Sequence, residues 1–541
     1  MRILFLPLII ILFHCKMNGQ YEDKPSLIVQ VVVDQLRYDY ISKYWSHYSD
    51  DGFKKLIKEG YFNANAHYSQ VPTYTGVGHA IIASGTTPSI HGIAGNNWYD
   101  REQKKLVYCV EDETAETVGS SSNEGKFSPR NLISNTLADQ LKILHSQSKT
   151  IGISLKDRGA ILMAGHLADA AYWFDGSEGK FITSNYYMDE LPEWVVQFNE
   201  ENPPKKYLNT TWELSRNAEE YIFSTEDNMP FEGKINGEID PVFPYDLASL
   251  YESFGPGLIR TTPFGNTYTF DFSKETIIRE DLGKGAFTDL ISISLSSPDY
   301  LGHVFGPHSM EIEDHYIRLD EDFANFIHFL ESWVGKENLL LLISSDHGVA
   351  DIPAYVKGNT SYFPDRFLRD TLKRFSIEYF GDDLIEFVFN DQIYLDRKKV
   401  KALNINFGEL KQTIVEWLIE QEGISGAADP SSGYCITDQS ICIRIQNGYH
   451  PKRSGDVFYV KSPGWIDQYN LRGGTTHGSP YPYDTHVPVI WYGFKTKPGI
   501  SHERVAIKDI APTISSLLGI NYPNGATGLP MKEYLDTIFK K

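Results

Sequence analysis

The chain is poor in cysteine and in positive charge. Only 4 of its 541 residues are cysteines, which excludes a small scaffold held together mainly by disulfides. Lysine and arginine number 50 against 71 aspartates and glutamates, so the net charge is −21. This balance is the wrong sign for a surface that collects the nucleic-acid backbone, and we expect no nucleic acid as an obligate partner. Any site for an anion must be positive locally.

Long apolar runs are absent from all but the start of the sequence. Arg2 is followed by an apolar run that ends at Phe13, which is the pattern of a secretory signal. No later run reaches the roughly 18 apolar residues that a membrane helix needs. We therefore expect a signal peptide over residues 1–20 and a periplasmic or secreted mature chain without a membrane span. The oligomeric state stays open, with a monomer as one option.

The rest of the chain alternates between strand-like and helix-like segments. Near-continuous apolar runs at 27–33, 289–295, 339–344 and 487–493 are typical of strands buried on both faces. Helical spacing over about 311–333 predicts a helix before the third run. Ser128-Pro129 predicts the start of another, which would bury Leu132, Ile133, Leu137, Leu141 and Leu144. The fold class is α/β, a central, mostly parallel sheet flanked by helices.

Two long stretches, about 166–275 and 352–470, have weaker periodicity and more polar residues. Because ligands of an open α/β sheet lie at the carboxyl ends of its strands, insertions that leave from those ends are expected to cap the site. Residues 21–541 would then form one α/β domain with two cap insertions. Cys435 and Cys442 are close enough in sequence for a hairpin disulfide, whereas Cys109 is expected to be a buried thiol.

Acidic and histidine side chains stand at the ends of the predicted strands. Asp34 follows the first run, Asp299 the second, and the pair Asp346-His347 the third, while His303 lies four residues after Asp299 and His477 precedes the fourth run. A single strand-end aspartate usually caps a helix, and a single loop histidine is usually just hydrogen-bonded. Together, two sets of three oxygen and imidazole ligands indicate two catalytic metal ions, zinc or manganese.

Thr75 directly precedes the apolar helical pattern GVGHAIIASG, so its hydroxyl lies at a helix N-terminus. Free backbone N–H groups and the helix dipole favour negative charge there. A nearby metal ion would stabilise the threonine alkoxide and make it a nucleophile. The alternative is an ordinary N-cap threonine.

The ordered set Asp34, Thr75, Asn96, Asp299, His303, Asp346, His347 and His477 resembles the alkaline phosphatase superfamily. The segments SLKDRGAILMAG, SSPDYLGHVFGP and THGSPYPYDTHVP are similar to those of PafA-type periplasmic alkaline phosphatases. The resemblance covers nearly the whole mature chain. It implies a secreted hydrolase of phosphate monoesters, that is an alkaline phosphatase, with two Zn²⁺ ions and a phosphothreonine intermediate.

The resemblance also implies a role for each site residue. Thr75 would be the nucleophile and a metal ligand. Asp299, His303 and His477 would hold one zinc, and Asp34, Asp346 and His347 the other. Asn96, Lys156 and Arg158 would contact the non-bridging phosphate oxygens. His486 stays open as an alternative to His477.

Two other functions fit parts of the pattern. A phosphodiesterase or nucleotide pyrophosphatase shares the scaffold and the metal ligands, but a diester has one negative oxygen fewer to occupy Lys156 and Arg158. Without the resemblance, Lys156 and Arg158 would be interpreted as solvated surface charges. A periplasmic binding module with structural zinc is the second alternative, and it predicts no turnover.

Overall fold

The computed structural model describes residues 24–236, 239–356 and 358–540. The predicted signal peptide at 1–20 lies outside these residues. Among the helices in the described ranges, none combines the length and apolar character that crossing a membrane requires.

An eleven-stranded mixed sheet forms the centre of the molecule, in the order β21-β2-β20-β12-β1-β11-β6-β7-β8-β5, with β22 paired to β2. Its strands are β1 (Leu27–Val33), β2 (Tyr61–His67), β5 (Thr117–Val118), β6 (Thr150–Ser154), β7 (Ala170–Asp175), β8 (Lys180–Ser184), β11 (Asp289–Leu295), β12 (Leu339–Ser344), β20 (His486–Gly493), β21 (Gly499–Ser501) and β22 (Val505–Ala506). The four predicted strands are confirmed as β1, β11, β12 and β20. The run from β12 through β1, β11 and β6 to β7 is parallel, whereas β20 pairs antiparallel with both of its neighbours.

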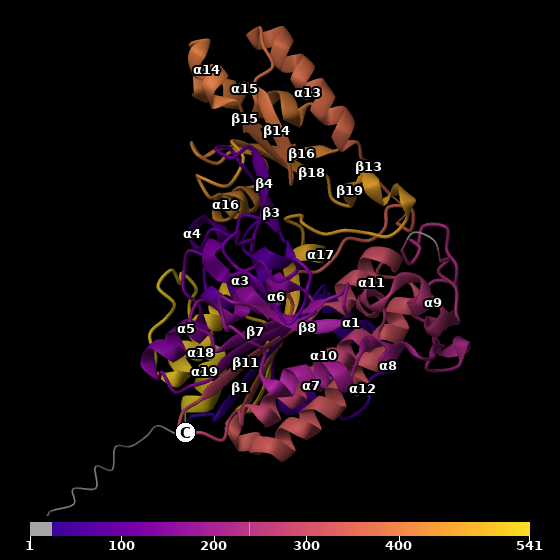
Figure 1. The fold of residues 1–541 in the computed structure, drawn as a ribbon. Helices are drawn as coiled ribbons and strands as arrows, with labels where there is room; N and C mark the ends of the chain where they lie inside the picture. Colours follow the sequence, from indigo (N-terminus) through magenta and orange to yellow (C-terminus); the bar gives the residue numbers. More distant parts are fainter. Residues whose placement is uncertain (1–23, 237–238, 357, 541) are drawn as a thin grey trace, which may run out of the picture.

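Both faces of this sheet are covered, so the central strands β1, β11 and β12 are buried along their whole length and are mostly apolar. Along β1, Leu27, Val29 and Val31 belong to one core and Ile28 and Val32 to the other. Helices α10 (Phe264–Arg279) and α12 (Met310–Val334) pack on the first face, and α3 (Thr75–Ser84), α6 (Asp157–Ala164) and α18 (Ile510–Leu518) on the second (Figure 1). The predicted α/β class is confirmed.

One predicted helix is right and one is wrong. The helix expected at about 311–333 is α12. The helix expected from Ser128-Pro129 is only a short 3-10 turn, and the chain leaves it in an extended conformation at Leu132. Helix α5 (Leu137–Leu144) begins instead at Thr136, which forms a capping box with Asp139. Ile133 and Leu144 are therefore exposed rather than buried.

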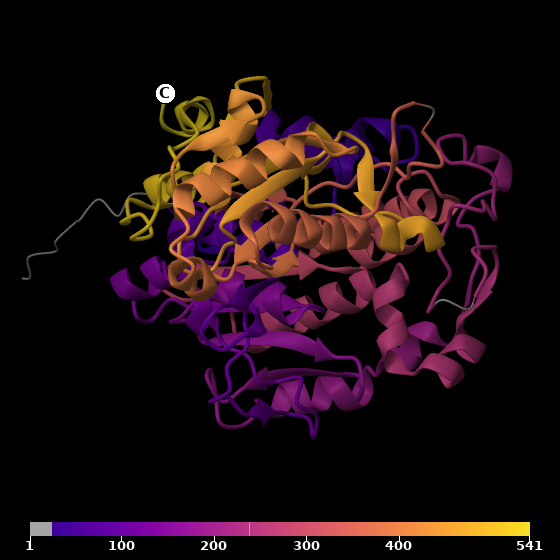
Figure 2. The same cartoon turned by 90° about the horizontal axis from the view of Figure 1, so that it is seen from above.

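A second layer lies above the carboxyl ends of the central parallel strands (Figure 1). It has a five-stranded sheet in the order β14-β15-β18-β16-β17 and a core of its own. Its elements are β14 (Ile385–Phe389), β15 (Gln392–Leu395), β16 (Ile424–Asp429), β17 (Tyr434–Ile436), β18 (Val457–Lys461), α13 (Asp365–Phe380), α14 (Arg397–Ala402) and α15 (Phe407–Ile419). Figure 2 shows these helices from above, lying across the central part of the molecule. The other long stretch, about 166–275, begins with β7 and β8, which belong to the central sheet, and then runs outside that sheet. A capping role for either stretch stays a prediction.

The cysteines are arranged as expected. Cys435 and Cys442 form a disulfide, with their Cα atoms 6.1 Å apart, between β17 and α16 (Gln439–Gly448). Cys109 is buried and unpaired, and burial raises its pKa to about 12, so that it stays a thiol.

Two buried glutamates lie near each other, Glu311 in the first turn of α12 and Glu232 in a loop. Glu311 accepts a hydrogen bond from the Tyr245 hydroxyl at 2.5 Å, and Glu232 is only 5% exposed. Burial and the nearby Glu311 raise the pKa of Glu232 to about 8, and burial raises the pKa of Glu311 to about 7. The folded protein therefore holds protons here that the unfolded chain has already released.

This pair predicts a loss of stability at alkaline pH. The contribution of Glu232 is fully present below its ordinary pKa of 4.5 and is lost as the pH rises toward about 8. We expect Glu232→Gln to raise the free energy of unfolding at pH 9 by about 2 kcal/mol, with little change at pH 5. Urea denaturation at both pH values measures this, with the exposed Glu219→Gln as the control. A variant that is equally or less stable than the parent at pH 9 would contradict it.

Candidate metal centre and active site

Four neighbouring parallel strands end at the candidate site. In the order β12, β1, β11 and β6, they are followed by Asp346-His347, Asp34, Asp299 and Lys156 with Arg158. Asp299 lies in the first turn of α11 (Ser297–Phe305), and Lys156 directly precedes α6. Because the strands are in register, with Val33 beside Leu295 and Val32 beside Ser344, their carboxyl ends bring these side chains to one edge of the sheet.

The first candidate metal set is Asp299, His303 and His477, whose ligand atoms all lie within 4.8 Å of one another. His303 Nε2 is 3.2 Å and His477 Nε2 3.6 Å from Asp299 Oδ1. His303 follows Asp299 by one helical turn on α11, and His477 comes from the loop before β20. Burial raises the pKa of Asp299, but the adjacent histidines and Lys156 outweigh it and hold the pKa well below its ordinary value.

The second candidate set is Asp34, Asp346 and His79, again with ligand atoms within 4.8 Å of one another. His347 adjoins it, with its Nε2 atom 3.2 Å from Asp346 Oδ2. Burial and the nearby Asp346 raise the pKa of Asp34. Burial also opposes ionisation of Asp346, but His347 overcomes it and lowers the pKa to about 2. Two carboxylates this close need a positive partner.

The hydrogen bonds of the histidines indicate what that partner is. His79, His303, His347 and His477 each have Nδ1 within 2.7–2.9 Å of a backbone carbonyl oxygen, so Nδ1 carries the proton. The Nε2 atom of each ring then presents a lone pair to a carboxylate. Such a lone pair needs a proton or a metal ion between it and the carboxylate. A hydrogen bond from Nδ1 to a backbone carbonyl oxygen is typical of a histidine that binds metal through Nε2. His79 Nε2 and Asp346 Oδ2 are buried without a hydrogen-bond partner among the described residues. The residues therefore fit a pair of divalent cations.

Thr75 is the first residue of α3, and its hydroxyl is directed into the site. Thr75 Oγ1 lies 3.5 Å from His347 Nε2 and 3.5 Å from Arg158 Nη2. It makes no capping hydrogen bond, and Tyr74 is the residue at the N-cap position. The alternative of an ordinary N-cap threonine is therefore wrong. Gly85, at a φ of 68°, ends this helix as the sequence predicts.

Asn96 and Arg158 lie on the other side of Thr75. Asn96 Oδ1 accepts a hydrogen bond from the backbone N–H of Gly76 at 2.8 Å, which leaves its amide nitrogen as the available donor. Arg158 Nη1 donates to the Tyr108 hydroxyl at 3.1 Å, and that hydroxyl in turn donates to Asp157. Arg158 is thus held beside Thr75 with its charge retained.

Lys156 lies between the two candidate metal sets. Its Nζ atom is 2.9 Å from Asp34 Oδ2 and 2.5 Å from Asp299 Oδ2, and the side chain is 2% exposed. Burial lowers the pKa of Lys156, but the two carboxylates outweigh burial and raise it above its ordinary value. The interpretation of Lys156 as a solvated surface charge is wrong.

Two residues close to His477 in sequence, His486 and Asp484, lie outside the candidate metal sets. His486 stacks on Tyr38 and His67, with ring centroids 4.0 and 4.3 Å away, and its Nε2 atom lies 3.0 Å from the Ala64 carbonyl oxygen. It belongs to neither candidate metal set. Asp484 accepts hydrogen bonds from the backbone N–H groups of Gly478 and Ser479, so it shapes the loop that carries His477.

Sequence reasoning missed His79, Tyr108 and Asp157. His79 follows Thr75 by four residues, so their shared helix face could have shown that the two are neighbours. Tyr108 comes from strand β4 (Lys105–Tyr108), far from Arg158 in sequence and without a motif of its own.

A family model described as type I phosphodiesterase / nucleotide pyrophosphatase matches residues 28–480. Among curated relatives, a protein of Myroides odoratus named calcium-transporting ATPase is 41% identical, over 95% of this chain and 95% of that one. Alkaline phosphatase PafA of Elizabethkingia meningoseptica is also 41% identical, again over 95% of both chains.

The crystal structure of wild-type alkaline phosphatase PafA is similar to this one, with a TM-score of 0.91 and 41% identity, over 94% of this chain and 99% of that chain. A second PafA structure, of a variant with a threonine, an asparagine, a lysine and an arginine substituted, has a TM-score of 0.90 and 40% identity over the same shares.

The close approach of α3 to the end of β12 predicts a sharp effect at Gly78. A Cβ atom there would lie 2.2 Å from the backbone oxygen of Asp346, so a larger residue must push the helix away from the candidate metal ligands. We expect Gly78→Ala to lower the free energy of unfolding by about 1–3 kcal/mol and to reduce the bound metal measured by mass spectrometry. Gly408→Ala, whose Cβ would meet only Asn406 Oδ1 at 3.4 Å, is the control. Unchanged metal content in Gly78→Ala would contradict this role of the contact.

Proposed function

The chain belongs to the type I phosphodiesterase / nucleotide pyrophosphatase family, within the alkaline phosphatase superfamily and alongside PafA, and we propose that it hydrolyses phosphate monoesters through a phosphothreonine on Thr75. The observation that carries this proposal is the position of the Thr75 hydroxyl. It lies within 3.5 Å of both His347 and Arg158, at the start of a helix and beside two sets of metal-type ligands.

The proposed reaction has two displacements at phosphorus. The Thr75 oxygen bonds to phosphorus as the bond to the ester oxygen breaks, and the threonine proton and the departing alkoxide are balanced through solvent. Water then attacks the phosphothreonine, the bond from Thr75 to phosphorus breaks, and inorganic phosphate leaves. Each step needs positive charge around the transferred group.

The chain supplies part of this charge itself. Arg158 presents a planar donor pair to the phosphoryl oxygens, and Lys156 a compact charge. The Asn96 amide and the N-terminus of α3 add neutral donors. The protein as a whole is strongly acidic, so these local groups set the sign of the pocket.

We further propose that the first set, Asp299, His303 and His477, and the second set, Asp34, Asp346 and His347 with Thr75, each hold a zinc ion. His79 is placed to act as a further ligand or as a neighbour of the second set. When bound, two such ions would stabilise the charge that develops on the attacking and leaving oxygens.

Secretion completes the proposal. The sequence at residues 1–20 has the pattern of a signal peptide, and we propose a periplasmic or secreted enzyme. The disulfide between Cys435 and Cys442 suits an oxidising compartment.

The competing function is phosphodiester hydrolysis, which the name of the family model includes. A diester replaces one charged phosphoryl oxygen with an organic group. That group would remove one of the charged oxygens that Arg158 can contact beside Thr75, whereas Lys156 keeps its two carboxylate partners, Asp34 and Asp299. Arg158 therefore favours a monoester.

Arg158→Ala tests this preference. We expect kcat/KM for p-nitrophenyl phosphate to fall by about 10²-fold or more and kcat/KM for bis-p-nitrophenyl phosphate to fall much less, because only the monoester presents the extra charge. Steady-state kinetics on both esters measure the ratio.

Thr75→Ala is the companion variant. It should abolish turnover of both esters, and mass spectrometry of acid-quenched parent enzyme should find phosphothreonine at position 75. A parent enzyme that prefers the diester, or a Thr75→Ala variant that keeps monoesterase activity, would overturn the proposal.

A further inference from the structure

A groove of 890 Å³ runs between the second layer and the residue that precedes the nucleophile. Its walls come from the start of α13, the turn between β14 and β15, the 3-10 turn at Gln468–Arg472, and Tyr74. The lining includes Arg366, Arg369, Arg472, Phe389, Tyr459 and Tyr469.

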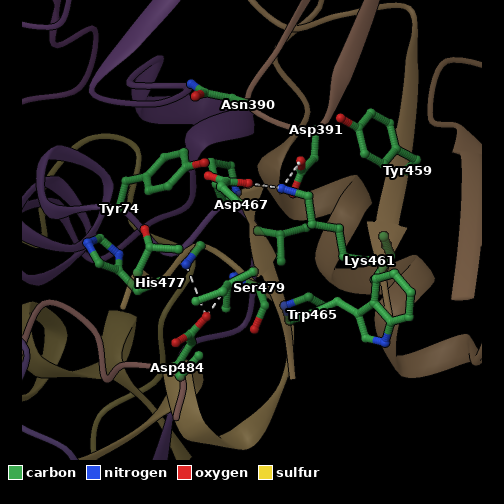
Figure 3. Close-up of a pocket in the computed structure, with 18 of the residues that line it drawn as sticks. Tyr74, Asn390, Asp391, Tyr459, Lys461, Trp465, Asp467, His477, Ser479 and Asp484 are labelled. Atoms are coloured by element: carbon green, nitrogen blue, oxygen red, sulfur yellow. Dashed lines mark hydrogen bonds and ion pairs between the residues drawn. The ribbon is translucent and has the colours of Figure 1, made fainter. Parts of the chain in front are cut away.

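The groove continues toward His477 of the candidate active site. A second, narrower cavity shares Tyr74, Asn390, Asp391, Tyr459 and Asp467 with it and is also lined by His477. Figure 3 shows Tyr74 and His477 on one side of this cavity and the side chains of the second layer on the other. The Tyr74 ring meets the edge of His477 with centroids 5.8 Å apart. A molecule bound at the metal ligands can therefore extend past Tyr74 into the groove.

Three acidic residues line the groove, and all three lie close to the amino group of one lysine, Lys461. Lys461 Nζ lies 2.9 Å from Asp391 and in contact with Asp467 (Figure 3). It also lies 3.5 Å from Asp365. Burial and the neighbouring acids raise the pKa of Asp365 to about 6, net of the opposing effect of Lys461. Lys461 therefore balances part of the negative charge of this cluster.

The three arginines of the groove are in the opposite situation. Arg366, Arg369 and Arg472 are exposed, and their side chains have no hydrogen bond or ion pair with another residue in the described ranges. Arg366 and Arg369 lie in the first turns of α13, where no carboxylate other than Asp365 and Asp370 is near in sequence. In a chain of net charge −21, three unpaired guanidinium groups around one groove form a local site for an anion.

We propose that this groove binds the alcohol portion of the substrate and selects phosphate monoesters that carry a second anionic group, a phosphate or carboxylate, at the far end. The inference rests on the proposed function, because it takes the phosphoryl group to lie at Thr75. In an in-line displacement the leaving alcohol departs on the side opposite the nucleophile. His477 forms a wall of the connecting cavity. It belongs to the first candidate metal set, and Thr75 is proposed to belong to the second.

The test uses a series of unbranched alkyl phosphates of increasing length, each compared with its ω-carboxylate analogue. For the parent enzyme, we expect the carboxylate to raise kcat/KM at the chain length that spans the groove, by roughly threefold to tenfold, since exposed ion pairs are individually weak. The increase should shrink at high salt. Binding of the same pair to Thr75→Ala, measured by calorimetry, should show the same preference without turnover.

Variants of the arginines decide the assignment. The triple variant Arg366→Ala, Arg369→Ala, Arg472→Ala should lose the preference for the carboxylate. Arg369→Glu should reverse it in favour of an ω-ammonium analogue, which damage to the fold would not do. Arg504→Ala removes an exposed, unpaired arginine elsewhere and should keep the parent preference.

The outcomes separate the two proposals. If the parent enzyme hydrolyses the alkyl phosphates but shows no preference for the anionic analogue at any length, the groove assignment is overturned and the phosphatase proposal stands. If the preference persists in the triple variant, the assignment to these arginines is equally overturned. If the parent enzyme hydrolyses none of the monoesters, the proposed function itself has failed.

Discussion

The structure depends on the burial of three carboxylates at the ends of adjacent parallel strands. Asp34, Asp299 and Asp346 are almost fully buried, and burial alone would drive each of them to take up a proton. The lysine and the histidine rings around them counter this effect. A site of this kind is stable only when cations occupy it, because the removal of one partner leaves an uncompensated buried charge. The buried negative charge lowers the stability of the empty site. The same charge enables the site to bind metal ions next to the hydroxyl of Thr75.

The local structure around each ligand follows from that requirement. Backbone carbonyls fix the tautomer of the histidines, the Ser294 hydroxyl donates to Asp34, and the Gln35 amide donates to Asp299 at 2.7 Å. Gly78 lets α3 approach the backbone of Asp346 closely enough to bring Thr75 to His347. Thr75, the proposed nucleophile, is therefore positioned by the end of the same strand that two of the metal-type ligands follow.

Much of this could be predicted from the sequence, for identifiable reasons. Strands buried on both faces are continuous apolar runs, so β1, β11 and β12 were visible, and so were the acidic residues that follow them. The helix predicted from Ser128 failed because Thr136 and Asp139 form a stronger start signal a few residues later. His79, Tyr108 and the second sheet could not be found in the same way, because their roles depend on tertiary contacts that leave no local pattern. The resemblance to a known superfamily supplied the roles that spacing alone left open.

The central claim is that two divalent cations lie between these carboxylates and Thr75. The most direct measurement is the metal content of the purified protein, combined with anomalous diffraction at the zinc edge. The account predicts two ions per chain, one among Asp299, His303 and His477 and one among Asp34, Asp346 and His347, with loss of phosphatase activity when a chelator removes them. A protein that is active without metal, or that binds its ions elsewhere, would contradict it.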